Sequence, residues 1–110
     1  MMMTDRMVEV RPRKEATMKS ATISNYVNDA VFPTKKLDEK DKVLEFMRKP
    51  VPFCATAGHF EDAITGEPVE DRPWPWYRRG GWQWSDRDIY HVEKYDLELD
   101  SEFVAYALSH

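Results

Sequence analysis

In the first half of the chain apolar residues recur every three or four positions, and this spacing predicts two helices. The first begins at Ser20 or Thr22 and stops before Pro33. Its apolar stripe consists of Ile23, Tyr26, Val27, Ala30 and Val31. The second covers residues 38–49 and ends at Pro50, because proline restricts the residue before it to an extended conformation. Its stripe is Val43, Leu44 and Met47, with Phe46 beside it.

The segment that follows is richer in extended and turn residues. Residues 52–57 (PFCATA) predict a strand, and Gly58 and Gly66 mark turns. Residues 67–75 are acidic and contain three prolines, Pro68, Pro73 and Pro75. Since proline cannot donate to a strand ladder, this segment predicts an ordered loop rather than a strand.

All four tryptophans lie within residues 73–100, around the pair Gly80–Gly81. Two β-prone runs, 76–79 and 82–84, flank the glycines, which is typical of a hairpin whose turn needs positive φ. Side chains alternate along a strand, so one face of the hairpin carries Tyr77, Arg79, Trp82 and Trp84. The other face carries Trp76, Arg78 and Gln83. We expect the first face to cover the core and Arg79 to lie over Trp82 as a cation–π pair.

Two short helices are predicted after the hairpin. Ser85 precedes two carboxylates and can cap a helix over residues 86–95. Asp100 can cap a last helix over residues 101–108. The fold class expected is α+β, with two N-terminal helices, a small antiparallel sheet and two short C-terminal helices. The helices should cover the aromatic face of the sheet.

The length of 110 residues corresponds to one domain, assigned to residues 18–110, and residues 1–17 are expected to form a flexible tail. Cys54 is the single cysteine, which excludes an intrachain disulfide and suits a reducing compartment. The sequence contains no long apolar run or secretion signal, so a cytoplasmic location without membrane contact is expected.

Charge is distributed unevenly along the chain, whose net charge is −4. Residues 1–49 carry eleven basic and eight acidic side chains, a balance of +3. Residues 50–110 carry five basic and twelve acidic side chains, a balance of −7. The acidic half is either a solvated face or a docking surface for a partner with a basic surface.

Few residues of the chain are suited to catalysis or metal binding. Cys54, His59 and His91 are the best available ligands, with Glu61 or Asp62 nearby, but their spacing is not that of a zinc site. Cys54 with a histidine could form a nucleophilic pair, yet no oxyanion-hole motif surrounds it. We therefore expect no cofactor and no metal site, and we keep a small metal-dependent enzyme as the least favoured alternative for the function.

Four sequence motifs carry a resemblance: T-A-G-x-F-x-D-x-x-T-G-E, W-x-W-S, I-Y-H-V-E-K-Y-x-L-x-L and E-F-V. They span Thr56 to Val104. This part of the chain resembles the C-terminal end of small bacterial and phage-encoded proteins, some of which look like immunity proteins or stoichiometric inhibitors. The resemblance implies a protein that acts by occupying its partner, for example a nuclease or a CRISPR effector. It transfers no functional residue.

Two binding functions remain open. Aromatic residues beside arginines can stack on the bases of single-stranded nucleic acid. Tryptophan and arginine also dominate protein–protein hot spots, and prolines stiffen the segment before the hairpin, which favours protein binding. The residues expected to bind a partner are Trp74, Trp76, Arg78, Arg79, Asp86, Asp88 and Glu93. Trp74 is expected to be exposed, and its loss to leave stability unchanged.

Overall fold

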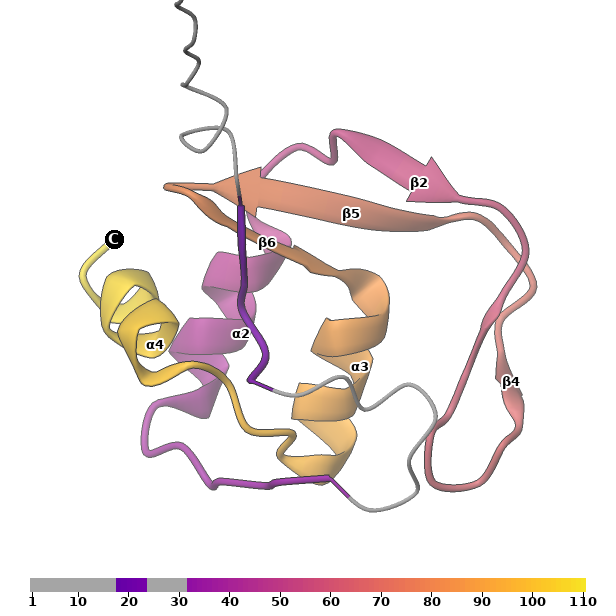
Figure 1. The fold of residues 1–110 in the computed structure, drawn as a ribbon, viewed down its shortest axis with the longest axis horizontal. Helices are drawn as coiled ribbons and strands as arrows, with labels where there is room; N and C mark the ends of the chain where they lie inside the picture. Colours follow the sequence, from indigo (N-terminus) through magenta and orange to yellow (C-terminus); the bar gives the residue numbers. More distant parts are fainter. Residues whose placement is uncertain (1–17, 24–31) are drawn as a thin grey trace, which may run out of the picture.

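The computed structural model describes residues 18–23 and 32–110. Within them the chain has the expected α+β class, with three helices and two small sheets (Figure 1). The helices are α2 (Lys40–Arg48), α3 (Asp86–Tyr95) and α4 (Ser101–Leu108). The strands are β1 (Lys19–Ser20), β2 (Cys54–Thr56), β3 (Phe60–Glu61), β4 (Pro68–Val69), β5 (Trp74–Arg79) and β6 (Trp82–Ser85).

The main sheet has four strands in the order β1-β6-β5-β2. The pairs β2–β5 and β5–β6 are antiparallel, but β1 runs parallel to β6, so the expectation of a purely antiparallel sheet is wrong. A hairpin turn forces antiparallel pairing, whereas β1 reaches β6 through a long connection that leaves either direction open. Strands β3 and β4 form a separate two-stranded sheet.

All three helices lie on one side of the main sheet (Figure 1). The core between them is aromatic: Trp84 and Phe103 are fully buried, with ring centroids 5.1 Å apart. Phe46 of α2 packs on both rings. The indole Nε1 of Trp84 donates a hydrogen bond of 2.8 Å to the carbonyl of Met47, so the most buried ring leaves no polar atom unsatisfied.

The predicted hairpin is confirmed, including its register. Arg79 pairs with Trp82 and Tyr77 with Trp84, and Gly80 and Gly81 adopt φ angles of 60° and 86°. The expected cation–π pair is wrong, because the guanidinium of Arg79 lies 5.0 Å from the ring centroid of Phe46. The ring of Trp82 is met instead by Lys19, its register partner in β1, at 5.4 Å.

Strand β5 begins at Trp74, inside the segment predicted to be a loop. Pro75 is tolerated because its partner across the ladder is Ala55 of β2, while the ladder with β6 starts only at Trp76. No strand therefore lies on the other side of residue 75 to require an N–H group. Pro68 likewise lies in a strand, the edge strand β4.

Both C-terminal helices are confirmed with their caps. Ser85 and Asp88 form a reciprocal capping box at the start of α3, and the Asp100 side chain accepts from the N–H of Glu102. The second predicted helix is present as α2, slightly shorter than expected. Most of the first predicted helix lies on residues 24–31, outside the described part, as does the predicted tail at 1–17. Ser20 is part of β1 rather than a helix cap.

Candidate functional site

Trp74 is not the exposed contact residue expected from the sequence. It is only 7% exposed and packs against Phe60 and Trp76, with ring centroids 5.4 and 5.7 Å away. The guanidinium of Arg87 lies 5.1 Å from its ring. Neighbouring prolines stiffen this segment, but they do not decide on which side of a strand its side chains lie. The β3–β4 hairpin supplies Phe60 and covers the ring.

Two more of the expected binding residues serve the fold. Asp88 is 6% exposed, and its Oδ2 accepts from the backbone N–H of Ser85. Its side chain caps α3, and its contact with a partner stays a prediction. Arg79 lies on the helix side of the sheet, against Phe46.

Trp76 and Arg78 lie on the side of the sheet opposite the helices. Trp76 is partly buried, and its Nε1 donates to Thr56 Oγ1 over 2.9 Å. Arg78 is exposed, with its guanidinium 3.9 Å from the ring centroid of Phe53. These two remain available to a partner, but they are separated from the acidic residues of the expected set.

Asp86 and Glu93 line a groove formed by α2, α3 and the β3–β4 hairpin. The groove consists of three adjoining hollows of about 510, 240 and 310 Å³. Arg48 and Glu93 line both the first and the second hollow. Val69 and Tyr90 line both the second and the third. We call this continuous surface the α2–α3 groove.

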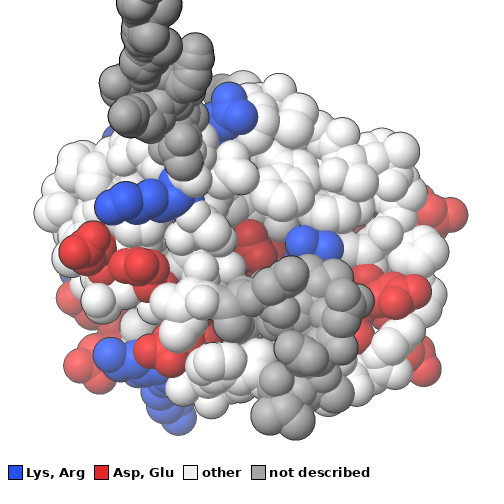
Figure 2. Space-filling view, viewed as in Figure 1, with Lys and Arg blue, Asp and Glu red and all other residues white. Residues whose placement is uncertain are grey.

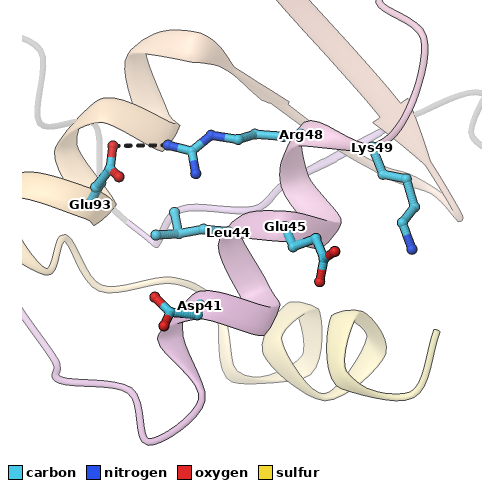
Figure 3. Close-up of a pocket in the computed structure, with 6 residues that line it drawn as sticks. All are labelled: Asp41, Leu44, Glu45, Arg48, Lys49 and Glu93. Atoms are coloured by element: carbon cyan, nitrogen blue, oxygen red, sulfur yellow. Dashed lines mark hydrogen bonds and ion pairs between the residues drawn. The ribbon is translucent and has the colours of Figure 1, made fainter.

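The first hollow lies between α2 and α3, where Figure 3 shows an ion pair joining the two helices. Arg48 donates to Glu93 over 2.9 Å, and Leu44 lies between the helices below this pair. The carboxylates of Asp41 and Glu45 lie along the same helix as Leu44 (Figure 3). The hollow therefore combines an apolar floor with carboxylates at its rim.

Asp86, which lines the second hollow, is bound from behind by a buried phenol that is not itself part of the lining. The hydroxyl of Tyr77 donates to Asp86 Oδ1 over 3.0 Å. Burial, together with the negative charge of Asp86, raises the pKa of Tyr77 to about 12 despite the opposing charges of Arg48 and Arg72. Asp86 is thus held by an uncharged donor.

The third hollow is built around Asp62, which is only 2% exposed. Its Oδ2 accepts from the hydroxyls of Tyr90 and Tyr95 at 2.6 Å each, and its Oδ1 accepts from the N–H groups of Ile64 and Thr65. Burial alone would raise the pKa of Asp62, but these four donors outweigh burial and hold the pKa far below its usual range. Asp62 therefore fastens the β3–β4 hairpin to α3.

Acidic side chains outnumber basic ones around the α2–α3 groove. The acidic residues are Asp41, Glu45, Asp62, Glu67, Glu70, Asp86 and Glu93. The basic ones are Arg48, Lys49, Arg72 and Lys94. Arg48 is paired with Glu93 and Arg72 with Glu70. Asp41, Glu45 and Glu67 make no ion pair with any other described residue, so the groove has uncompensated negative charge.

The candidate metal and nucleophile residues are not brought together. Cys54 is exposed in β2, whereas His91 is fully buried in α3. His91 Nε2 accepts from the N–H of Ala63 and its Nδ1 is bonded to the carbonyl of Arg87, so both ring nitrogens are engaged. Burial lowers the pKa of His91, in keeping with a neutral ring.

Among residues 18–23 and 32–110, no group of three or more metal-ligating side chains is positioned to hold an ion. In the same residues, no helix has the length and apolar character needed to cross a membrane.

Sequence reasoning missed Arg48, Arg72, Tyr90 and Lys94, which line the groove, and Tyr95, which binds Asp62. The sequence did contain a signal for Asp62. An aspartate shortly before a turn such as Thr65–Gly66 typically accepts hydrogen bonds from the backbone of that turn. For Arg48 and Arg72 no local pattern distinguishes them from ordinary surface arginines.

Comparison with known proteins adds no assignment: no family model, no curated protein and no solved structure matches the chain.

Proposed function

We propose that this chain is a stoichiometric protein-binding module that docks a basic segment of a partner into the α2–α3 groove. The observation that carries the proposal is the excess of carboxylates around a hollow surface with an apolar floor. Lysine and arginine fit such a surface, because their aliphatic stems can lie on Leu44 and Ile89 while their charged ends meet carboxylates.

The acidic residues of the groove come from both halves of the sequence. Asp41 and Glu45 belong to α2, and Asp86 and Glu93 belong to α3. The fold therefore gathers negative charge into one surface, which steers a basic partner toward it and strengthens discrimination against acidic ones.

A module of this kind acts by occupying its partner. The resemblance of residues 56–104 to immunity-type and phage-encoded inhibitors agrees with such a role in the cytoplasm. A nuclease or a CRISPR effector would offer a basic groove that normally binds nucleic acid, and an acidic inhibitor would compete for it.

The test begins with capture of a partner from the native host and measurement of its affinity by calorimetry. Glu45→Gln then removes a groove carboxylate that makes no ion pair within the described part of the chain. We expect this change to weaken binding by about 3- to 10-fold, with a smaller dependence on salt. Glu102→Gln, at an exposed position of α4 outside the groove and 3.9 Å from Lys19, is the control and should leave affinity unchanged.

Equal effects of the two changes would refute the groove as the binding site. Tight binding of single-stranded oligonucleotides, with a steep salt dependence, would instead favour the nucleic-acid module. Stoichiometric zinc in the purified protein, together with turnover of a small substrate, would replace the proposal by a metal-dependent enzyme.

A further inference from the structure

Strand β2 is one of the two edge strands of the main sheet, and the segment around it carries no charged residue. Residues 50–60 (PVPFCATAGHF) contain no Asp, Glu, Lys or Arg, although a third of the chain is charged. Residues 51–59 are all exposed, including Val51 at 87% and Phe53 at 42%. Figure 2 shows mostly uncharged atoms at the upper right of the molecule, where Figure 1 places β2.

The two edges of the main sheet differ in a way that matters for pairing. Edge strands of monomeric proteins are usually blunted by a charge, a proline or a cover, because an open ladder recruits other strands. The β1 edge has Lys19 and is only two residues long. Strand β2 has no charge and no proline within Cys54–Thr56.

The register of β2 shows which of its backbone groups are free to pair. Ala55 faces Pro75, which has no N–H, so the ladder with β5 must run through the residues on either side, Cys54 and Thr56. In an antiparallel ladder the intervening residue directs its N–H and C=O to the opposite side. The N–H and C=O of Ala55 therefore point out of the sheet at its open edge.

We infer that β2 pairs antiparallel with β2 of a second copy of this chain, with Ala55 opposite the partner's Ala55. This arrangement goes beyond the proposed function and uses a different surface from the α2–α3 groove. A twofold axis would pass between the two Ala55 residues, which would exchange two backbone hydrogen bonds. The two main sheets would join into one continuous sheet with all helices on one side.

The register of this pairing is self-complementary. Cys54 lies opposite the partner's Thr56, and the pairing is confined to residues 54–56, because the N–H of Phe53 is already donated to the carbonyl of Trp76 within its own sheet. No two like charges face each other across the axis, which would be destabilising. Charge also favours a second copy over the basic partner proposed for the groove. Residues 50–60 contain no carboxylate that could attract a basic strand to this edge.

The first test is the oligomeric state, measured by sedimentation equilibrium over a range of protein concentrations. We expect a concentration-dependent dimer, weak because a short strand pair buries little surface. Ala55→Lys places two like charges on the axis and should leave a folded monomer, as judged by circular dichroism. Ala105→Lys adds the same charge at an exposed alanine of α4 and should leave the dimer intact.

The second test is a crosslink that reports the register. Residues facing each other in a pair without mutual hydrogen bonds have Cα atoms about 4.5 Å apart, within the range of a disulfide. Thr56→Cys therefore lets Cys54 join the introduced thiol of the other copy, and mild oxidation should give a covalent dimer. Thr65→Cys changes an exposed threonine that also accepts one hydrogen bond but lies outside β2, in the turn after β3, and should give little covalent dimer.

Two outcomes would overturn the inference. One is a monomeric wild-type protein at about 1 mM, where even a pairing free energy of about 4 kcal/mol gives a half-populated dimer. The other is a dimer that persists in Ala55→Lys, or that crosslinks equally through position 65, because either result places the contact elsewhere.

Discussion

The hydroxyl of Tyr106, in α4, lies over the backbone of Gly80, in the space that a Cβ atom at position 80 would occupy. Gly80 and Gly81 both adopt positive φ, but only Gly80 has a neighbour within van der Waals distance of that position. Tyr106 also meets the ring of Phe46 edge-on, with centroids 5.7 Å apart. The tip of the hairpin is thus held by the last helix. Both glycines are needed for their positive φ, and Gly80 is needed in addition because Tyr106 leaves no room for a side chain.

This difference gives a matched pair of variants. Gly81→Ala should destabilise the fold by about 1–2 kcal/mol, the cost of positive φ for a residue with a Cβ. Gly80→Ala should cost about 1–3 kcal/mol more, because its Cβ displaces the ring of Tyr106. Urea denaturation measures both. In the Tyr106→Ala background the two alanine variants should cost the same, and a persistent difference would contradict this account.

Asp62 should be essential to the attachment of the β3–β4 hairpin. Asp62→Asn replaces a carboxylate oxygen by an N–H donor facing existing donors, and we expect a loss of about 2–3 kcal/mol at neutral pH. Glu67→Gln changes an exposed acid of the same hairpin region and is the control. Chemical denaturation of the three proteins measures the difference, and equal stability of all three would show that Asp62 is dispensable.

The effect of Asp62 should depend on pH in a defined direction. Its pKa is lowered in the folded state, so its stabilisation is complete above the ordinary aspartate pKa of about 4 and is lost as the pH falls below that value. The free-energy gap between wild type and Asp62→Asn should therefore be constant from pH 7 to about 5 and shrink toward pH 2. If the gap widened as the pH fell, the pKa of Asp62 would be raised in the folded state, which would contradict this prediction.

Two buried tryptophans should respond differently to removal of the indole nitrogen. Trp84 Nε1 donates to Met47, whereas Trp74 Nε1 has no hydrogen-bond partner among the described residues. Trp84→Phe should cost about 1–2 kcal/mol more than Trp74→Phe, since it leaves a buried carbonyl unsatisfied. Thermal denaturation measures the difference. Because Trp74 is buried, Trp74→Ala should also destabilise the fold. Unchanged stability of this variant would indicate that Trp74 is exposed instead.

The hydroxyl of Tyr77 should lose its proton at a higher pH than that of an exposed tyrosine. Its pKa is raised to about 12 by burial and by Asp86. Its contribution to stability should be complete below the ordinary tyrosine pKa of about 10 and should be lost as the pH rises through 12. The phenolate absorbance of wild type minus that of Tyr77→Phe isolates this residue. A difference curve centred near pH 10 would contradict the buried bond to Asp86.

The sequence by itself determined the features whose causes are local. A turn through Gly80–Gly81 needs only two residues that accept positive φ, and the caps at Ser85 and Asp100 need only a side-chain oxygen beside the first helical N–H groups. The hairpin register followed from the turn, and with it the set of side chains on its helix-facing side. Each of these features depends only on residues that are neighbours in the chain.

The tertiary structure alone decided what depends on distant partners. Trp74 has a stiff proline context in the sequence, yet its burial depends on Phe60 and Arg87, which other elements bring to it. The α2–α3 groove exists because Arg48 meets Glu93, 45 residues away, and because Tyr95 reaches Asp62 across 33. A periodic pattern records which face of an element is apolar, but it carries no information about which other element will cover that face.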